Sequence, residues 1–551
     1  MDFYQEFLRE IKKQNHSDKQ LAKLKRSLAL KYKLNQVPTN IEILLNCPEK
    51  EINLFKHKLL TKPTRTIAGV APVAIMTKPA PCPHGKCAYC MGGVNSYFGD
   101  VPQSYTGKEP ATMRGIRNRY DSYLQVFNRL EQYLLLGHVI DKVELIIMGG
   151  TFPSLPQSYQ EEFTWGAFKA MNDFSKLFFN KEGLDFIKFK QFFELPAVDL
   201  QDKKRTERIQ LKLAKIKGIF QEKELAKEQQ INETAKIRCV ALCLETRPDY
   251  CGEKEIKEML KLGCTRVELG VQHLDDKILK QIERGHGVKE TIQATKKLKN
   301  YFLKVGYHVM PGLPGSSITK DQKMLKQLFT DQNLRPDALK IYPCMVAPGT
   351  KVYDWFKAGT FQPLTTEKAT KLIAEFKETV PEYVRILRVQ RDIPTYQITA
   401  GVDMTNLRQY LTQKYQPKCR CIRCREPKNQ NLDLKSTELK IKKYLASQGE
   451  EYFISIEEPK KDLLLGFCRL RIFNKQAGIR ELHVYGTATG IGEEGNIQHR
   501  GLGKKLLGAA EKIVQKNKIK TILVISGIGV KEYYQKLGYF KEGYYMRKDL
   551  S

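Results

Sequence analysis

Three cysteines in one short stretch of sequence, Cys82, Cys87 and Cys90, have a spacing that points directly to chemistry. Three thiolates so close together suit an iron–sulfur cluster or a zinc ion. A structural zinc ion takes four ligands, and His84 could be the fourth. A cubane cluster held by three cysteines instead leaves one iron open to a small chelating ligand. The aromatic residue before the last cysteine, Tyr89, favours the cubane.

Glycines and polar residues end several apolar stretches that we interpret as strands. Gly149 and Gly150 would let a ligand approach the backbone closely, because glycine has no side chain. Polar groups at strand ends can bind the ribose and the carboxylate of a cofactor, although Glu245 and Arg247 could instead form an ion pair with each other. The candidate ligand-binding residues at these strand ends are Gly149, Gly150, Thr151, Glu245, Arg247 and Gln272.

The C-terminal part of the sequence carries a second group of candidate binding residues. Two glycines at a predicted helix start would present free backbone N–H groups, which can cradle a pyrophosphate, although an ordinary capped helix would fit as well. The strand predicted before this helix could pair with an extended pantetheine arm. The candidates in these elements and in a later tyrosine-rich segment are Glu481, Leu482, His483, Val484, Gln498, Gly501, Leu502, Gly503, Lys504 and Tyr534.

A second cysteine cluster, Cys419, Cys421 and Cys424, lies in a basic stretch between the two groups. Three thiolates suggest a structural zinc ion that joins two domains. The spacing identifies no fourth ligand, and Cys344 is one candidate. Because the ligand set is incomplete, three reduced cysteines without a metal remain an alternative.

The elements that must position these residues follow an alternating pattern. Six continuous apolar runs separated by helical segments predict parallel strands covered on both faces, and hence βαβ units of an α/β protein. Six such units would make an incomplete (βα)6 TIM-like barrel, with the first cysteines and the strand-end residues at the edge where a barrel keeps its chemistry. The predicted strands are Ile67–Lys78, Lys142–Gly150, Ile237–Thr246, Arg266–Gln272, Lys304–Gly312 and Ala338–Val346.

The sequence predicts four successive parts. Residues 1–65 form a basic, helical N-terminal extension, and residues 66–380 hold the barrel, which charged helical sequence interrupts at 173–235. Residues 381–450 form a basic connector that contains the second cysteine cluster. Residues 451–551 change style and predict a compact α/β domain with an antiparallel beginning.

Composition limits the classes of function. The 551 residues include 41% hydrophobic residues, enough to build cores, which excludes a fully disordered chain. The formal net charge of +32 points to a polyanionic partner such as nucleic acid, although a lysine-rich solvated surface explains it about equally well. The sequence has no apolar run long enough to cross a membrane and no secretory signal. We therefore expect a cytoplasmic protein whose thirteen cysteines are ligands or thiols rather than disulfides.

The first cysteine motif and the Met148–Thr151 segment together resemble the radical S-adenosylmethionine (SAM) superfamily, whose usual spacing is x3 and x2 rather than the x4 and x2 found here. The glycine-containing helix start and the Tyr533–Tyr539 segment resemble the Gcn5-related (GNAT) acetyltransferases. Joined in one chain, the two are similar to the catalytic subunit family of Elongator. Further segments that carry this resemblance are Ser104–Pro110, Asp141–Glu144, Glu245–Tyr250, Arg388–Pro394 and Arg480–Gly486.

The resemblance implies an enzyme that places a carboxymethyl-type group on C5 of the wobble uridine of tRNA (U34), with acetyl-CoA as the carbon source. Cys82, Cys87 and Cys90 would hold a [4Fe-4S] cluster that chelates SAM, and reductive cleavage of SAM would yield a 5′-deoxyadenosyl radical. This radical would take hydrogen from the acetyl methyl group. The carbon radical would then add to uracil, and hydrolysis of the thioester would release coenzyme A.

The resemblance also implies roles for the other candidates. The strand-end residues would contact SAM, and the C-terminal candidates would bind acetyl-CoA, with Tyr534 protonating the leaving thiolate. Lys142 matches a family lysine assigned to acetyl-CoA in the radical domain. The N-terminal extension, with Arg114, Arg117 and Arg119, would contact phosphates of the anticodon stem-loop. The implied partners also include an electron-donor protein and either accessory Elongator subunits or a second copy of the chain, but no membrane.

Two other functions remain open from the sequence. The protein could be a protein lysine acetyltransferase with a structural iron–sulfur cluster, or an RNA-binding scaffold without activity. A merely structural cluster would not require the glycines and polar residues at the strand ends, such as Gly149, Gly150 and Thr151. The intact cysteines and Tyr534 weigh against a scaffold. The sequence therefore favours the tRNA-modifying enzyme.

Overall fold

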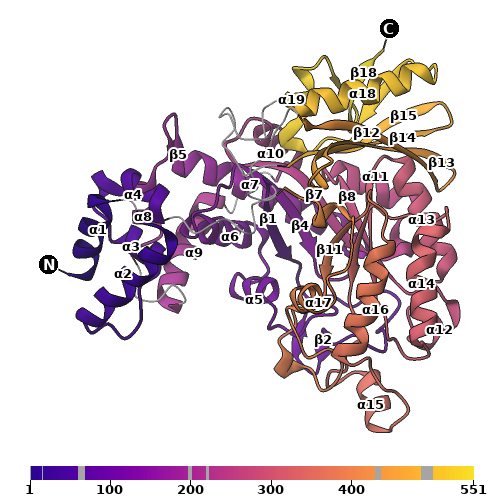
Figure 1. Cartoon of the computed structure of the whole chain (residues 1–551), viewed down its shortest axis with the longest axis horizontal. Helices are drawn as coiled ribbons and strands as arrows, with labels where there is room; N and C mark the ends of the chain where they lie inside the picture. The colour runs from indigo at the N-terminus through magenta and orange to yellow at the C-terminus, as the bar shows by residue number, and fades with distance from the viewer. Residues whose placement is uncertain are drawn as a thin grey trace.

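The computed structural model describes residues 2–14, 16–59, 69–196, 202–218, 223–427, 436–485 and 501–550. These residues form three parts that follow one another along the chain (Figure 1). The N-terminal helices lie to one side, a parallel sheet with its helices occupies the middle, and a second sheet lies across one end of the first (Figure 1). Among the described helices, none is both long and apolar enough to span a lipid bilayer.

The N-terminal part is helical, as predicted. Asp2, Ser17 and Thr39 cap three of its helices, each accepting a hydrogen bond from a backbone N–H three residues further on. The apolar faces of these helices form a core of their own around Phe7 and Phe55, which are both fully buried. The helices are α1 (Phe3–Lys13), α2 (Asp18–Lys31), α3 (Asn40–Leu45) and α4 (Ile52–Leu59).

The middle part is a sheet of seven parallel strands in the order β1-β4-β7-β8-β9-β10-β11. Its two outer strands, β1 and β11, are not hydrogen-bonded to each other, so the barrel is open, as predicted. Six of the strands fall within the predicted runs or differ from them by a few residues. The strands are β1 (Ala71–Met76), β4 (Lys142–Met148), β7 (Arg238–Thr246), β8 (Arg266–Gln272), β9 (Lys304–Val309), β10 (Ala338–Ile341) and β11 (Arg385–Val389).

The seventh strand differs from the expectation of six. β11 lies in the stretch that the sequence assigned to the connector, and it pairs in parallel with β10. Its sequence, RILRV, is short and contains two arginines, so it lacks the continuous apolar run by which the other parallel strands were recognised. The barrel sheet therefore extends past residue 380.

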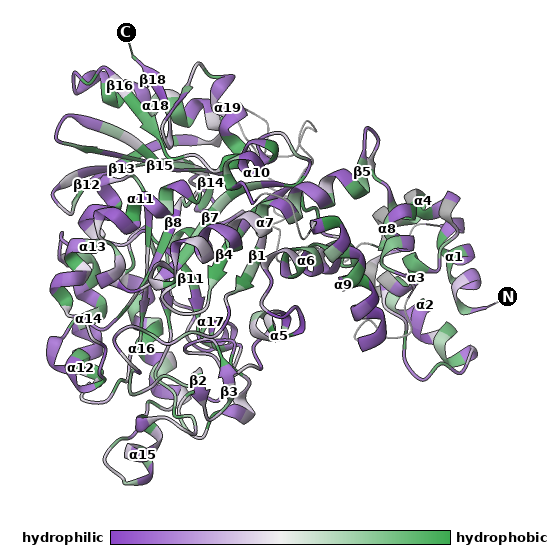
Figure 2. Ribbon diagram, turned by 180° about the vertical axis from the view of Figure 1, so that it is seen from behind, coloured by the Kyte–Doolittle hydropathy of each residue, from purple (hydrophilic) through white to green (hydrophobic). Residues whose placement is uncertain are grey.

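Helices connect the barrel strands and cover the outer face of the sheet (Figure 1). The segment between β4 and β7 is largely helical, as predicted, and its helix α9 is mostly hydrophilic (Figure 2). Two short hairpins are formed by β2 (Gly93–Ser96) with β3 (Gly99–Val101) and by β5 (Phe179–Asn180) with β6 (Gly183–Leu184). The helices are α5 (Pro110–Arg117), α6 (Ser122–Leu135), α7 (Gln157–Phe178), α8 (Phe186–Phe192), α9 (Lys203–Lys217), α10 (Leu225–Asn232), α11 (Glu253–Lys261), α12 (Asp276–Gln281), α13 (Val288–Asn300), α14 (Ile318–Thr330), α15 (Lys351–Lys357), α16 (Thr366–Thr379) and α17 (Leu407–Tyr415).

The C-terminal part is a second sheet, in the order β12-β13-β14-β15-β16-β18-β17, with two helices. It begins antiparallel, as predicted, but its first strand, β12, lies within the predicted connector. β12 is an exposed edge strand rich in lysine, which makes its sequence resemble a polar linker. The elements are β12 (Glu438–Ala446), β13 (Gly449–Glu458), β14 (Leu463–Phe473), β15 (Gln476–Val484), α18 (Leu502–Lys516), β16 (Thr521–Val524), α19 (Lys531–Gln535), β17 (Phe540–Glu542) and β18 (Tyr545–Asp549).

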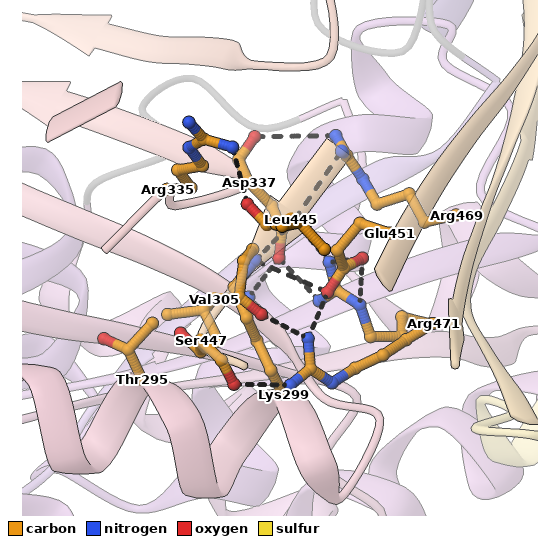
Figure 3. A network of polar contacts seen from close by, with 12 residues as sticks. Thr295, Lys299, Val305, Arg335, Asp337, Leu445, Ser447, Glu451, Arg469 and Arg471 are labelled. Carbon is orange, nitrogen blue, oxygen red and sulfur yellow. Dashed lines mark hydrogen bonds and ion pairs between the residues drawn. The ribbon is translucent and has the colours of Figure 1, made fainter. Parts of the chain in front are cut away.

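A buried network of ion pairs joins the two sheets (Figure 3). Arg480 of β15 donates to both carboxylate oxygens of Asp337, at 2.6 and 2.7 Å, and to Glu451 of β13 at 2.9 Å. Lys299 of α13 lies 3.8 Å from Asp337 and 3.6 Å from Glu451. Arg471 donates to the other oxygen of Glu451 at 2.9 Å. Because these side chains are almost fully buried and come from both the barrel part and the C-terminal sheet, they fix one part against the other.

Candidate active site

One cavity of about 1780 Å³ connects the two groups of candidate residues. Its wall includes Cys82 in the loop after β1 and Tyr534 in α19. Between these limits the cavity is lined by the inner face of the barrel sheet, by the end of β15 and by the start of α18. The structure therefore brings most of the predicted SAM-binding and acetyl-CoA-binding residues to a single shared space; Gly149 is not part of its lining.

The three thiols of the first cluster are spread out. Among the described residues, Cys82, Cys87 and Cys90 do not form a group whose sulfurs all lie within 4.8 Å of one another. Thiolates on one tetrahedral zinc ion would lie about 3.8 Å apart, because the Zn–S bond is about 2.3 Å. In a cubane cluster, each cysteine binds a different iron. The wider placement fits the cluster rather than a single zinc ion.

Cationic and polar groups surround these thiols. The Cys87 sulfur accepts a hydrogen bond from Arg284 at 3.5 Å and lies 3.1 Å from Nε2 of His84. Cys90 donates to Gln103 at 3.0 Å. Burial, with a smaller contribution from the neighbouring Cys87, raises the pKa of Cys90 to about 11. This thiol therefore keeps its proton until a metal centre replaces it.

The glycine turn after β4 lies beside the cysteine loop. Gly149 and Gly150 have φ of +126° and +114°, which other residues rarely adopt. A side chain on Gly149 would also place its Cβ 2.2 Å from the hydroxyl oxygen of Thr77. The hydroxyl of Thr151 lies 3.9 Å from the sulfur of Cys82. Thus the turn needs glycine for two independent reasons and adjoins the cluster loop.

Two of the other strand-end candidates, Arg247 and Gln272, line the cavity and have a buried polar atom without a hydrogen-bond partner in the described structure. Arg247 pairs with Asp249 at 2.7 Å, but its Nη1 has no hydrogen bond, and neither does Oε1 of Gln272. Glu245 pairs with Lys340 at 2.8 Å. The ion pair between Glu245 and Arg247, considered from the sequence, is therefore not formed. Unpartnered buried groups in a cavity wall fit a polar ligand such as SAM.

At the opposite end, β15 and β16 separate. They pair in parallel over only two residues of each strand, ending at Ile479 and Val524. The residues that follow on the two strands, 481–485 and 525–527, line opposite sides of the cavity. The gap between the strands leaves backbone groups of β15 available to an extended ligand, and their pairing with a pantetheine arm stays a prediction.

The N-terminus of α18 also opens into the cavity. Gly501 precedes the helix with φ of +77°, and the first helical residues, Leu502, Gly503 and Lys504, line the cavity wall. A Cβ on Gly503 would lie 2.5 Å from the hydroxyl oxygen of Tyr533, so a larger residue would require the Tyr533 side chain to move. Free N–H groups at such a helix start favour an anion. The remaining candidate of this segment, Gln498, lies outside the described residues.

Three other candidates of the acetyltransferase end differ in their surroundings. Burial raises the pKa of Tyr534, so its phenol stays protonated at neutral pH. Burial lowers the pKa of His483 to about 4, which leaves a neutral ring. Although burial opposes it, the charges of Lys304 and Arg469 lower the pKa of Glu481 to about 2. The side chain of Glu481 is thus engaged between the barrel and the C-terminal sheet, and Glu481 lines the cavity together with Leu482, His483 and Val484.

Lys142 lies at the start of β4, far along the strand from Gly149. It lines the same cavity, and burial lowers its pKa, an effect that the charge of Asp141 opposes. The two ends of a strand lie at opposite edges of a parallel sheet, so the start of β4 is at one edge and the glycine turn that follows β4 is at the other. Lys142 is therefore at the edge where the barrel meets the acetyltransferase sheet, not at the edge with the cysteine loop.

The second cysteine cluster is compact. The sulfurs of Cys419, Cys421 and Cys424 lie within 4.8 Å of one another, so the structure brings together the three predicted ligands. Cys344, which the sequence offered as one candidate for the fourth ligand, is not in this group among the described residues. It is fully buried in another cluster of apolar residues, with Cys87 and Tyr89, because the loop after β10 turns toward the cysteine loop of the barrel.

Several residues of the site were missed from the sequence. Arg284 and Gln103 contact the first cysteine cluster, and Glu268, His308 and Lys340 line the middle of the cavity. The last three lie on strands that the sequence identified as buried. A charged residue within an otherwise apolar strand is the sequence signal that could have identified them.

The fold and the site define a class of protein: a radical SAM half-barrel joined to a GNAT-type acetyltransferase domain. Family comparisons agree. The Radical SAM superfamily matches residues 196–328, the Radical_SAM C-terminal domain 336–416, the Acetyltransferase (GNAT) family 417–539 and the ELP3 N-terminal domain 1–67. The cofactors of this class are a [4Fe-4S] cluster, SAM and acetyl-CoA.

Similar proteins extend along nearly the whole chain. The tRNA uridine(34) acetyltransferase of Methanocaldococcus infernus is 46% identical over 536 residues, covering 93% of this chain and 92% of the relative. Elongator complex protein 3 of Saccharomyces cerevisiae is 37% identical over 545 residues, covering 94% and 90%. A solved structure, that of the archaeal M. infernus Elp3 with an N-terminal deletion (1–46), matches with a TM-score of 0.70 and 41% identity. The match covers 88% of this chain and 100% of that chain. The chain belongs to the Elongator complex protein 3 family.

Proposed function

We propose that this protein carboxymethylates C5 of the wobble uridine, U34, of tRNA, using acetyl-CoA and SAM. The observation that carries the proposal is the single cavity that joins the cysteine loop to the acetyltransferase sheet. A carbon radical made from an acetyl group has to reach the uracil ring before it is quenched. A single cavity that joins the two proposed cofactor sites would keep the radical away from solvent until it reaches the base.

When bound, the cluster and SAM supply a 5′-deoxyadenosyl radical that takes hydrogen from the acetyl methyl group. Cys82, Cys87 and Cys90 would hold the cluster, and Arg284 would place a positive charge beside it. The free polar atoms of Arg247 and Gln272 would orient SAM, together with the backbone at Gly149 and Gly150 and with Thr151 and Glu245. The assignment of Thr151 rests on its distance of 3.9 Å from the sulfur of Cys82, and the others rest on the position of these residues at the ends of β4, β7 and β8.

At the other end, the backbone of β15 and the N-terminus of α18 would bind acetyl-CoA. Tyr534 would protonate the leaving thiolate, because its phenol keeps a proton at neutral pH. Lys142 would hold the acetyl end of the ligand where the two sheets meet.

The proposed macromolecular partner is the anticodon stem-loop of tRNA. Its support is the net charge of +32 and the names of the relatives, which include tRNA uridine(34) acetyltransferase and Elongator complex protein 3. The N-terminal helices, Arg114, Arg117 and Arg119 would contact phosphates, and single-stranded loops allow a base to be splayed out into a pocket. An electron-donor protein, and either other Elongator subunits or a second copy of the chain, complete the proposed partners.

We further propose that residues 419–424 bind a structural zinc ion between the barrel and the acetyltransferase sheet. The loop is held from both sides: Ile422 donates to the carbonyl of Val384 at 2.9 Å, and Leu464 donates to the carbonyl of Arg425 at 2.7 Å. The converging thiols of Cys419, Cys421 and Cys424 support a metal at this junction.

The test of the main proposal is a reaction with reconstituted protein under anaerobic conditions, containing SAM, tRNA and acetyl-CoA labelled in the methyl group. We expect labelled carboxymethyluridine in the digested tRNA, measured by mass spectrometry. A protein lysine acetyltransferase with a structural cluster would label peptides and leave tRNA unlabelled. That result, obtained with an intact cluster, would overturn the proposal.

A further inference from the structure

The inner face of the barrel is charged, whereas the interior of a closed (βα)8 barrel is usually filled with branched apolar side chains. In β4 the residues alternate between buried and partly exposed, and the partly exposed ones face the cavity. Burying charged groups is costly unless they are paired, so such a cluster marks a functional site. The charged residues that line the middle of the cavity are Glu144, Glu245, Arg266, Glu268, His308 and Lys340.

Glu268 and His308 form a dyad within this cluster. Oε2 of Glu268 lies 2.8 Å from Nε2 of His308, and the Glu268 side chain is 0% exposed. Although burial opposes it, the charges of Lys340 and Arg266 hold the pKa of Glu268 well below its usual range. A carboxylate can only accept a hydrogen bond, so Nε2 of His308 carries the proton.

This pairing fixes the tautomer of His308. In the neutral ring, Nδ1 then has a free lone pair. Among the described residues, Nδ1 takes part in no hydrogen bond, and it is not one of the fully buried atoms without a partner. The side chain is 14% exposed and lines the cavity. A base held by a buried carboxylate, with its free nitrogen toward a reaction space, is the arrangement used in acyl-transfer sites.

A metal ion would be an alternative use of these ligands. Glu245, Glu268 and His308 offer ligand atoms within 4.8 Å of one another. However, Lys340 forms ion pairs with both carboxylates, one of them at 2.8 Å to Glu245. Its ammonium group already supplies the positive charge that a cation would bring. The cluster therefore fits proton chemistry better than metal binding.

We propose that His308 is the general base for hydrolysis of the thioester and that Glu268 is its positioning residue. The proposal rests on the proposed function, in which the carboxymethyl group is first joined to uridine while still attached to coenzyme A. Water attacks the thioester carbonyl carbon, and its proton goes to Nδ1 of His308. The C–S bond breaks, and the thiolate takes a proton from Tyr534. The products are a carboxylic acid on uridine and free coenzyme A.

The test compares wild type with His308→Gln in the labelled reaction described above. We expect the variant to cleave SAM at close to the wild-type rate, because the radical step precedes hydrolysis. Carboxymethyluridine should fall by about 10²–10⁴-fold. In its place, the tRNA should carry uridine linked to coenzyme A through the thioester, detectable by its mass and released by hydroxylamine.

A matched control is Tyr342→Phe. The Tyr342 ring packs against His308 with centroids 5.6 Å apart, so this variant keeps the packing and removes only a hydroxyl group of the cavity wall. It should hydrolyse the thioester like wild type. Glu268→Gln keeps a hydrogen-bond acceptor but loses the charge, and should accumulate the same thioester with a smaller loss of product. If His308→Gln does not fold, Glu268→Gln is used to test the proposal instead.

The outcomes separate the two proposals. If wild type forms no labelled carboxymethyluridine, the proposed function fails. If wild type does so and the two variants form it at the wild-type rate, the role of His308 is wrong. Loss of product without the thioester adduct, or together with loss of SAM cleavage, also overturns it, because a structural fault rather than hydrolysis would then be responsible.

Discussion

The two ends of the cavity are built in different ways. At the cluster end, loops after parallel strands supply the groups: thiols, a glycine turn with positive φ, and unpartnered polar atoms of Arg247 and Gln272. At the acetyltransferase end, secondary structure itself supplies them, through two separating strands and a helix N-terminus. The cluster end is suited to hold a compact charged ligand, and the other end is suited to hold a long one.

This difference has a consequence for the reaction. Under the proposed function, a long ligand anchored at α18 would extend its reactive end toward the barrel, whereas SAM would bind near the cysteine loop. The acetyl group would then meet the radical within the barrel, along the wall that contains Lys142, Glu268 and His308. The ion-pair network around Asp337 and Arg480 holds the two ends at a fixed separation.

The largest effect is expected from a substitution at the cluster end of the cavity. Cys87→Ser should abolish the brown absorbance of the cluster and the cleavage of SAM, since a three-thiolate site cannot lose one ligand. Binding of acetyl-CoA should persist, because its proposed site lies in the other sheet. Both are measured on the reconstituted variant, by absorbance with 5′-deoxyadenosine analysis and by calorimetry. Retained formation of 5′-deoxyadenosine would contradict the assignment of the cluster.

A change at the acetyltransferase end should give the reverse pattern. Tyr534→Phe keeps the ring and its packing against Tyr539, but it removes the proposed general acid, a role typically worth about 10²–10⁴-fold. SAM cleavage should continue, while release of coenzyme A and formation of carboxymethyluridine fall together.

Tyr533→Phe is the control for Tyr534→Phe. Tyr533 also lines the cavity, but its hydroxyl group lies beside Gly503 rather than at the proposed thiolate site. This variant should reduce product formation much less. Equal losses in the two variants would show that neither phenol acts as a specific acid. Product is normalised to bound tRNA in both, so that a loss of affinity is not mistaken for a loss of chemistry.

The sequence predicted these two ends to different extents. The cysteine loop and the glycine turn could be recognised because their chemistry depends on local spacing. The apolar run Arg266–Gln272 located β8 with the correct bounds. It could not be predicted that Glu245 pairs with Lys340 rather than with Arg247, because that contact joins β7 to β10 across the barrel. The charged edge strand β12 and the arginine-containing β11 were missed because their patterns resemble linkers.

The fixed separation of the two ends is tested at their interface. Arg480→Met leaves Asp337 and Glu451 buried without their main partner, and breaking a buried pair in this way typically costs about 3–5 kcal/mol. We expect a lower unfolding temperature and more SAM cleaved per carboxymethyluridine formed. Arg547→Met is the control, because Arg547 forms exposed ion pairs within the same sheet and should change neither value appreciably.

The smallest expected effect concerns the second cysteine cluster. If it holds a structural zinc ion, wild type should contain about one zinc per chain, and Cys421→Ser should lose it and unfold at a lower temperature. The control is Cys47→Ser, which changes a cysteine in the core of the N-terminal helices. This variant should contain as much zinc as wild type. Because Cys419, Cys421 and Cys424 do not line the cavity, product formation below the unfolding temperature should fall only a few-fold. Metal analysis that finds no zinc in wild type would remove the metal from this junction.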